Sequence, residues 1–352
     1  MAVTNRAWWV RIGGAMAAMA LVAGCGGSGG GAPPPEPEGE TPTLTVYSGR
    51  SEELVGGLIE RMQAAIGAPV EVRYGSTGEM SAQLLEEGPN TPADLFFAQD
   101  AGALGALSKA GLLAPLPPET LALADERYRA PDGTWVATSV RARVIAYNPD
   151  RTAQADLPTS LEGLLDPRWR GQIGYAPSNA SWLSFVTGLR LLRGEDGARQ
   201  WLTAFAAQQP QRFEGNGAIV DAVDQGTVAL GLVNHYYLYE KTSEIDPATY
   251  QVANHYVPDD PLGLVNVAGA GVLSAADQPE LANRAVAYLL SAEAQQYLVD
   301  QTSEYPTVAG VAPTRSDPPL PPLESLSPPP VSLADLDSVD VTQQMLQETG
   351  LL

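Results

Sequence analysis

Short apolar runs alternate with longer amphipathic segments along the first part of the chain. The apolar runs are predicted to be strands and cover residues 44–47, 70–74 and 93–97. The segments between them carry apolar residues at helical spacing and are predicted to be helices, over residues 51–65, 79–87 and 101–110. Such alternation is typical of an α/β domain with a mainly parallel sheet.

The same pattern resumes after Arg141 and predicts a second α/β block. Its expected strands cover residues 171–176, 228–233 and 264–273. Its expected helices cover residues 181–192, 197–207, 218–224, 280–290 and 294–299. The chain is long enough for two cores. We therefore expect two lobes, the first built from residues 43–140 and 262–316 and the second from residues 141–261.

Two extended segments are expected to connect these lobes. The chain leaves lobe one near residues 139–147 and returns near residues 257–267. Two such crossings form a hinge, and the cleft between the lobes is then the natural place for a ligand.

The N-terminal end has the composition of an export signal. Arg6 and Arg11 precede an apolar run, residues 12–23, that is too short to cross a bilayer. Residues 1–24 are therefore predicted to be a signal peptide. Residues 25–42 are rich in Gly, Ser, Pro and Glu, and are predicted to be a flexible linker.

Cys25 is the single cysteine of the chain, so no internal disulfide is possible. The sequence Leu21-Val22-Ala23-Gly24-Cys25 resembles the lipobox of bacterial lipoproteins. This resemblance implies that Cys25 is lipidated and tethers the protein to a membrane. A plain signal peptide with an incidental cysteine is the alternative interpretation.

The C-terminal end, residues 317–352, is predicted to be a Pro-rich tail. Its last part, residues 341–352, has the pattern of a short helix, but the sequence leaves open whether this helix packs on the domain. The whole chain carries 20 Lys and Arg against 41 Asp and Glu, a formal charge of −21. This acidic excess argues against nucleic acid or anionic lipid as a partner, and solubility alone accounts for it.

Small polar residues follow most of the expected strands. These junctions are residues 48–51, 75–78, 99–100, 178–181, 215–217 and 234–237. Ligands of open α/β sheets bind beyond the C-terminal ends of strands, and free N–H groups at a helix start favour an anion. Helix capping is the better explanation of any one junction, but six junctions facing one cleft together favour an anion-binding surface. Arg50 and Arg141 would add bidentate donors, unless they form surface ion pairs. Further possible cleft residues are Ser48, Gln99, Asp100 and Tyr147.

Tyr236 and Tyr237 directly follow an apolar strand and Asn234. Adjacent residues of a strand point to opposite faces, so both phenols reach one point only where the strand ends and a helix begins. A phenol titrates near about pH 10, but a hard trivalent cation such as Fe³⁺ stabilises the phenolate. An aromatic pair packed at a domain edge is the alternative.

Taken together, the chain from Leu44 to Val311 resembles the periplasmic ferric-ion-binding proteins of ABC iron transporters. The stretches that carry this resemblance are residues 44–50, 93–101, 141–148, 166–171, 215–218, 233–237 and 303–306. The resemblance implies a two-lobed periplasmic-binding-protein-like (type II) α/β fold. It also implies delivery of the cargo to an ABC transporter permease, at the periplasm or the outer face of the cell membrane.

The resemblance assigns roles to individual residues. It implies that Tyr236 and Tyr237 bind Fe³⁺ through their phenolates. It implies a synergistic anion, carbonate or phosphate, whose holding positions match Asn179, Ala180, Ser181, Asn216 and Asn234.

The chain also departs from the pattern of the resembled proteins. Ser51 and Glu52 stand where many of them have a histidine, and Gln99 stands where some have a glutamate. Exogenous anions are then expected to complete the iron shell, with Arg50 and Arg141 balancing their charge.

Two other functions compete with iron binding. The same fold could bind an oxyanion or a small organic solute without iron. An enzyme would usually need a positioned histidine, cysteine or carboxylate pair, and neither His235 nor His255 lies in a catalytic arrangement. The chain is therefore predicted to be a monomeric binding protein, with no enzymatic activity and no nucleic-acid partner.

Overall fold

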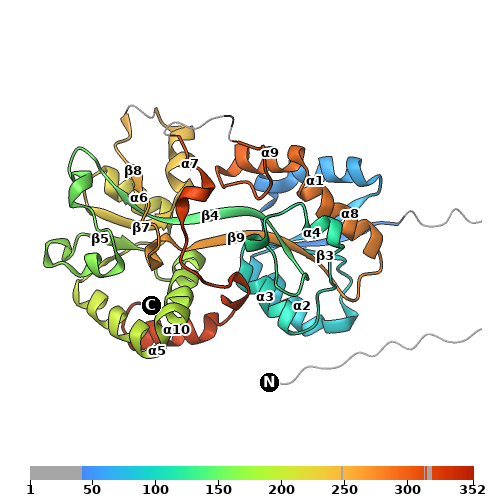
Figure 1. Cartoon of the computed structure of the whole chain (residues 1–352), viewed down its shortest axis with the longest axis horizontal. Helices are drawn as coiled ribbons and strands as arrows, with labels where there is room; N and C mark the ends of the chain where they lie inside the picture. Colours follow the sequence, from blue (N-terminus) through green and yellow to red (C-terminus); the bar gives the residue numbers. More distant parts are fainter. Residues whose placement is uncertain (1–41, 247–248, 313, 315–318) are drawn as a thin grey trace, which may run out of the picture. The chain divides into compact units, whose positions relative to one another are not determined.

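The computed structural model describes residues 42–246, 249–312, 314 and 319–352 (Figure 1). The predicted signal peptide, Cys25 and the linker up to residue 41 lie outside these residues. Thr41–Leu352 form one compact unit in the chain. No helix of the described part is long and apolar enough to cross a membrane.

The first lobe contains three parallel strands with helices between them. The strands are β1 (Leu44–Ser48), β2 (Val70–Tyr74) and β3 (Leu95–Ala98). The helices are α1 (Glu52–Ile66), α2 (Thr77–Glu87), α3 (Ala101–Lys109), α4 (Pro118–Leu121), α8 (Pro279–Leu289) and α9 (Ala292–Thr302). Helix α1 buries Val55, Leu58, Ile59, Met62 and Ile66, and this helical spacing places them on one face. That face packs against α8 and α9.

The second lobe repeats this arrangement. Its strands are β5 (Ile173–Tyr175), β6 (Gln211–Arg212), β7 (Leu230–Asn234) and β8 (Ala253–His255). Its helices are α5 (Ala180–Ala207), α6 (Asn216–Asp224) and α7 (Tyr236–Glu244). The two helices expected over 181–207 are the two arms of α5, which is kinked at Gly194, where φ is 69°. Glycine suits this position because φ is positive there.

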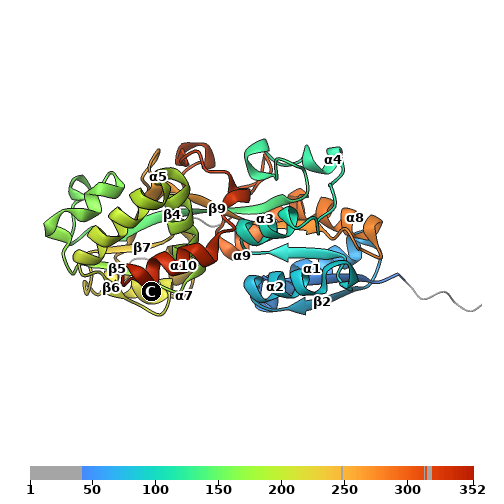
Figure 2. The same ribbon diagram turned by 90° about the horizontal axis from the view of Figure 1, so that it is seen from below.

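Strands β4 (Val136–Tyr147) and β9 (Val265–Val272) run side by side between the lobes (Figures 1 and 2). They pair antiparallel, with Arg141 opposite Asn266. The sheet order is β2-β1-β3-β9-β4-β7-β5-β6, with β8 paired to β4. The prediction of a mainly parallel sheet is therefore wrong at the centre of the sheet. There β9 is antiparallel to β3, β4 is antiparallel to β7, and β4 and β9 are antiparallel to each other. The return crossing, β9, begins at Val265, inside the segment 257–267 that was expected for it.

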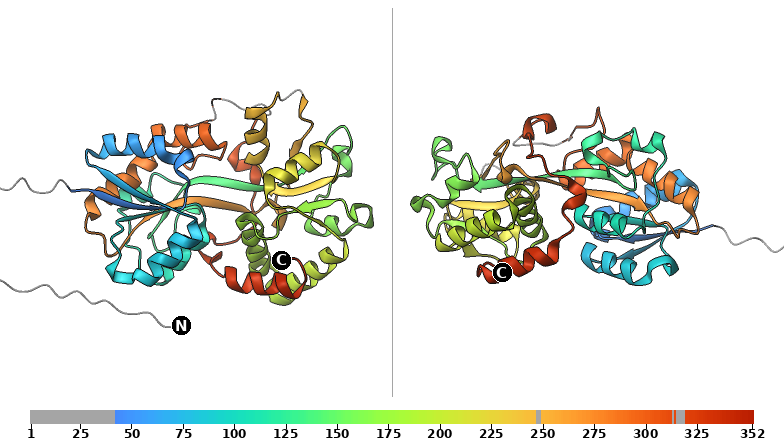
Figure 3. Two further views of the ribbon diagram at one scale, coloured as in Figure 1. Left: turned by 180° about the vertical axis from the view of Figure 1, so that it is seen from behind. Right: turned by 60° about the horizontal axis from the view of Figure 1, so that its bottom comes forward.

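The C-terminal tail is structured where the sequence left the question open. A short 3-10 helix, η9 (Leu333–Asp335), lies on α3, and helix α10 (Val339–Glu348) packs on α5. Figures 2 and 3 show this segment passing from one lobe to the other. The apolar face of α10 buries Met345 and Leu346 in the core of the second lobe.

Candidate metal centre

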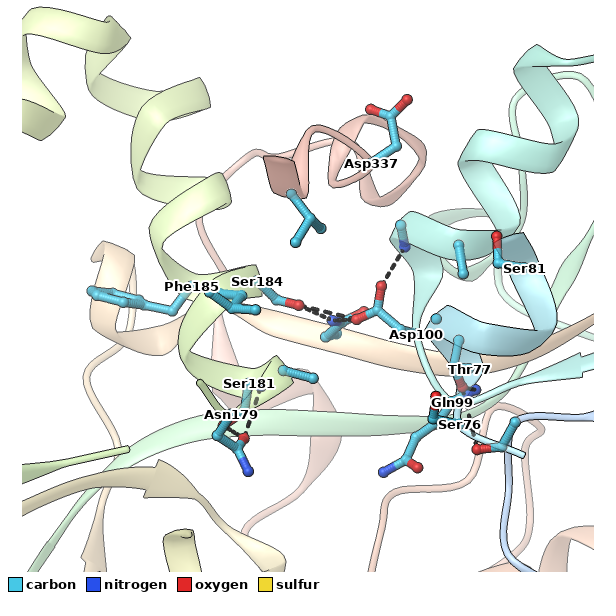
Figure 4. Close-up of a pocket in the computed structure, with 18 of the residues that line it drawn as sticks. Ser76, Thr77, Ser81, Gln99, Asp100, Asn179, Ser181, Ser184, Phe185 and Asp337 are labelled. Atoms are coloured by element: carbon cyan, nitrogen blue, oxygen red, sulfur yellow. Dashed lines mark hydrogen bonds between the residues drawn. The ribbon is translucent and has the colours of Figure 1, made fainter. Parts of the chain in front are cut away.

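A cavity of about 800 Å³ lies between the two lobes (Figure 4). It is lined by the junctions that follow β1, β2 and β3 on one side and by those that follow β5 and β7 on the other. Among the predicted site residues, those that line it are Gln99, Asp100, Arg141, Asn179, Ala180, Ser181, Asn234, Tyr236 and Tyr237. The expectation that these strand ends meet at one place therefore agrees with the structure.

Tyr236 and Tyr237 lie where the backbone turns from a strand into a helix. Strand β7 ends at Asn234 and α7 begins at Tyr236, so two adjacent side chains reach the same cavity. Their ring centroids are 4.5 Å apart, with 30° between the ring planes. Burial raises the pKa of Tyr236, and the neighbouring Tyr237 adds to the rise, whereas Arg141 opposes it. The Tyr236 phenol therefore keeps its proton unless a cation in the cleft stabilises the phenolate.

His235 is the buried residue that fixes this turn. Its Nδ1 accepts the backbone N–H of Ala142 at 3.1 Å, and its Nε2 lies 2.9 Å from the carbonyl oxygen of Ser303. Asn254 Nδ2 donates to the His235 carbonyl oxygen at 2.8 Å. Burial lowers the pKa of His235 to about 4, so the ring is neutral at pH 7. Both ring nitrogens have partners in β4 or after α9, which makes His235 a structural residue.

The start of α5 and the start of α6 meet beside the tyrosines. Asn179 caps α5: its Oδ1 accepts the backbone N–H of Ser181 at 2.9 Å and the Ser181 hydroxyl at 2.7 Å. Asn216 Nδ2 donates to Ser181 Oγ at 2.9 Å. Asn216 is 2% exposed and stands behind Asn179 and Ser181, outside the cavity lining. Helix capping thus explains Asn179, while Ser181 and Ala180 present the helix start to the cavity.

Two arginines of β4 line the cavity together. Arg141 Nη2 donates to the carbonyl oxygens of Gln99 and Val267, the latter at 3.3 Å. Arg143 Nη1 lies 3.3 Å from the Ser181 carbonyl oxygen, and its guanidinium stacks 4.9 Å from the Phe185 ring centre. Burial lowers the pKa of Arg143 to about 9. Sequence reasoning missed Arg143, although the two-residue spacing from Arg141 places both on one face of a strand.

Arg50 occupies a different place from the one predicted. It is fully buried, and its Nη1 pairs with Glu304 Oε2 at 3.1 Å. Ser48 Oγ donates to the Arg50 carbonyl oxygen at 2.8 Å, and Tyr147 packs in the core of the second lobe. None of Arg50, Ser48 and Tyr147 lines the cavity. The structure therefore does not bring Arg50 to an anion, and the alternative of a surface pair is also wrong, because both partners are buried.

Asp100 connects the two lobes inside the cavity (Figure 4). Its Oδ1 accepts the backbone N–H of Gly102 at 2.8 Å and so caps α3. Its Oδ2 accepts the Ser184 hydroxyl of α5 at 3.0 Å and Asn266 Nδ2 of β9 at 2.6 Å. Ser184 and Asn266 were missed by the sequence analysis, because only the folded chain brings α3, α5 and β9 together.

No group of three or more His, Cys, Asp or Glu side chains in the described part of the chain could hold a metal ion. The oxygen donors that line the cavity are instead the two phenols, hydroxyl and amide groups, and carboxylates. A hard cation accepts such oxygen ligands. The carboxylates of Asp100 and Asp337 are already engaged by hydrogen bonds and by Lys109, so a trivalent ion in the cavity needs ionised phenols or an accompanying anion to balance its charge.

Two α/β lobes, two crossing strands and a polar cavity between them define a two-lobed solute-binding protein. The sequence profile of the family described as bacterial extracellular solute-binding protein matches residues 90–330, and the chain belongs to this family. Membership confirms the prediction of a binding protein rather than an enzyme. It also confirms the predicted two-lobed fold, together with the structural likenesses that follow.

Several relatives share most of their length with this chain. The chain is 31% identical over 311 residues to the Fe(3+)-binding periplasmic protein of Serratia marcescens, covering 88% of this chain and 90% of that protein. The crystal structure of iron-bound HitA from Pseudomonas aeruginosa is similar at 34% identity and a TM-score of 0.79, covering 88% of this chain and 99% of HitA. A Trichodesmium protein (IdiA, FutA) in complex with iron and citrate has 27% identity and a TM-score of 0.77, covering 88% of this chain and all of that one.

Proposed function

We propose that this protein binds Fe³⁺ together with a synergistic anion in the interlobe cavity and delivers the iron to an ABC transporter permease. The observation that carries the proposal is the pair Tyr236 and Tyr237, two adjacent phenols that line one cavity with ring centroids 4.5 Å apart. The name of the Serratia relative, an Fe(3+)-binding periplasmic protein, and the iron-bound structure of Pseudomonas HitA support the same cargo.

The chemistry of the cavity fits a trivalent cation that arrives with an anion. Fe³⁺ replaces the phenol protons, because its charge outweighs the burial that raises the pKa of Tyr236. Two phenolates leave one positive charge on the ion, and a bound carbonate or phosphate neutralises it. The positive end of the α5 helix dipole and the guanidinium groups of Arg141 and Arg143 favour that anion on the cavity wall. Arg50 has no part in this set, because it is fully buried against Glu304 and does not line the cavity.

The proposal extends to the place and the manner of action. Cys25 is lipidated, becomes the new N-terminus when the signal is cleaved, and holds the protein at the outer face of the cell membrane or in the periplasm. The protein acts as a monomer. Iron and anion bind the open form, and bending at β4 and β9 closes the lobes around them. The permease then recognises the closed form.

A visible absorption titration tests the cargo. The purified protein, with Cys25→Ser to keep it free of lipid, is titrated with a soluble ferric chelate in bicarbonate and in phosphate buffer. We expect an orange-red tyrosinate-to-iron band that saturates at one iron per chain. The double variant Tyr236→Phe, Tyr237→Phe should lose the band and the saturable binding while keeping its circular dichroism spectrum.

Tyr239→Phe is the matched control, because Tyr239 lies on the same helix but outside the cavity lining. It should keep the full band. Full retention of iron affinity in the double variant would overturn the assignment of the tyrosines. If the wild-type protein stays colourless under every anion, the proposed cargo is no longer iron but an oxyanion or a small organic solute.

A further inference from the structure

The last residues of the chain, 331–352, contact both lobes, and we name this segment the C-terminal strap. Its first part lies on α3 of the first lobe, and α10 lies on α5 of the second lobe (Figures 2 and 3). The family profile ends at residue 330, so the strap lies beyond the part of the chain that it matches. The strap also forms part of the cavity wall through Asp337, Val339, Asp340 and Gln343.

The strap fits closely against α3. Leu336 is fully buried in the core of the first lobe, and Lys109 Nζ pairs with Asp337 Oδ1 at 2.9 Å. The strap backbone approaches α3 so closely that a Cβ atom at Gly105 would lie 2.3 Å from the Ala334 carbonyl oxygen. Glycine at position 105 is therefore what allows the strap to reach this helix.

The attachment to the second lobe is more extensive. Arg190 of α5 is 7% exposed, and its Nη1 donates to the Ser338 carbonyl oxygen at 2.9 Å and to Thr342 Oγ1 at 2.8 Å. The hydroxyl oxygens of Thr342 and Thr187 lie 2.7 Å apart. Leu346 is fully buried in the lobe-two core. The strap is therefore held on the second lobe by hydrogen bonds from a buried arginine and by packing of α10 in the core.

Asp337 and Ser338 are consecutive residues bound to opposite lobes. Asp337 pairs with Lys109 of α3, while Ser338 accepts from Arg190 of α5. Consecutive Cα atoms are about 3.8 Å apart, so the chain has no slack between the two attachments. The cavity lies between α3 and α5, because both helices contribute to its lining. Opening the cavity moves these helices apart and must break one attachment.

From these contacts we infer that the C-terminal strap is a clamp that holds the cleft closed, and that its α3 end must detach before the cleft opens. The α3 end releases because it has fewer buried polar contacts than the α10 end. The inference rests on the proposed function, because the closed cleft is what retains the bound iron. Its consequence is that the strap sets the rate of iron release.

The substitution Gly105→Ala tests the clamp, because the added methyl group meets only the strap backbone among its three nearest atoms. Alanine favours a helix over glycine, so α3 itself gains stability. Gly56→Ala in α1 is the matched control, since its added Cβ meets only Glu52 Cγ at an ordinary 3.6 Å. A second variant, Leu336→Ala, weakens the same attachment without altering α3.

Two measurements report on the clamp. Spin labels at Glu86→Cys of α2 and Gln200→Cys of α5, both exposed positions, give the interlobe distance in the iron-free Cys25→Ser chain. Release of bound iron to an excess of chelator gives the opening rate. We expect Gly105→Ala and Leu336→Ala to shift the label distances to longer values and to speed iron release by about tenfold. Gly56→Ala should match the wild type.

Unchanged distances and unchanged release in both strap variants, each folded by circular dichroism, would overturn the inference. The label distances need no iron, so they test the clamp even where the tyrosine variants refute iron binding. Conversely, a strap that proves irrelevant leaves the absorption test of Tyr236 and Tyr237 intact.

Discussion

Glu304 is a buried carboxylate that neutralises an arginine of another element. It is 3% exposed, its Oε2 lies 3.1 Å from Nη1 of the fully buried Arg50, and it also accepts the hydroxyl of Ser139 on β4. The Nε and Nη2 atoms of Arg50 have no hydrogen-bond partner in the structure. The substitution Glu304→Gln therefore leaves a buried guanidinium without any compensating charge.

The expected loss follows from this geometry. Removing one partner of a buried ion pair costs about 3–5 kcal/mol, and glutamine keeps an oxygen that can still accept from Arg50, so we expect about 3 kcal/mol. An unfolding entropy of about 2.1 cal/mol/K per residue over roughly 310 residues converts this loss to a Tm about 5 °C lower. Differential scanning calorimetry of the iron-free protein measures it.

Glu293→Gln provides the matched control. Glu293 pairs with Arg61 at 3.4 Å, but both side chains are more than half exposed, so this variant should lose less than about 1 kcal/mol. Equal losses in Glu304→Gln and Glu293→Gln would refute the reasoning. The double variant Arg50→Met, Glu304→Met should be more stable than Glu304→Gln, because it leaves only Arg141, and not both arginines, without the carboxylate.

Two further predictions concern stability. Burial alone would raise the pKa of Glu304, but the charges of Arg50 and Arg141 outweigh it and lower the pKa. The unfolded chain therefore takes up this proton first, so the pair's contribution is present above the ordinary glutamate pKa and is lost as pH falls below it. The Tm of the wild type should fall more steeply than that of Glu304→Gln between about pH 5 and pH 3. The second prediction concerns the capping box at the start of α2, where Ser76 Oγ accepts the Glu79 backbone N–H at 3.2 Å. Ser76→Ala should lower the free energy of unfolding, measured in urea, by about 1 kcal/mol. A loss near zero would contradict the role of the cap.

Local patterns in the sequence were sufficient for most of the elements. The apolar face of α1 has the spacing of a helix, and the strand over residues 70–74 was predicted with the bounds that β2 has. The turn at Tyr236 was also predicted, since two adjacent tyrosines share a cavity only where a strand gives way to a helix. These features depend on residues within one or two turns of each other, so they can be predicted from the local sequence.

The sequence by itself determined the two-lobed α/β plan, the cleft and the position of the tyrosine pair within it. Tertiary structure decided the partners of the charged groups. Arg50 looked like an anion donor because it follows a strand, yet it pairs with Glu304, 254 positions away. Arg143 reaches the cavity while its guanidinium stacks on Phe185, and residues 331–352 span both lobes. Pattern and propensity act over a few residues, whereas ion pairs and strap contacts join segments that only the folded chain brings together.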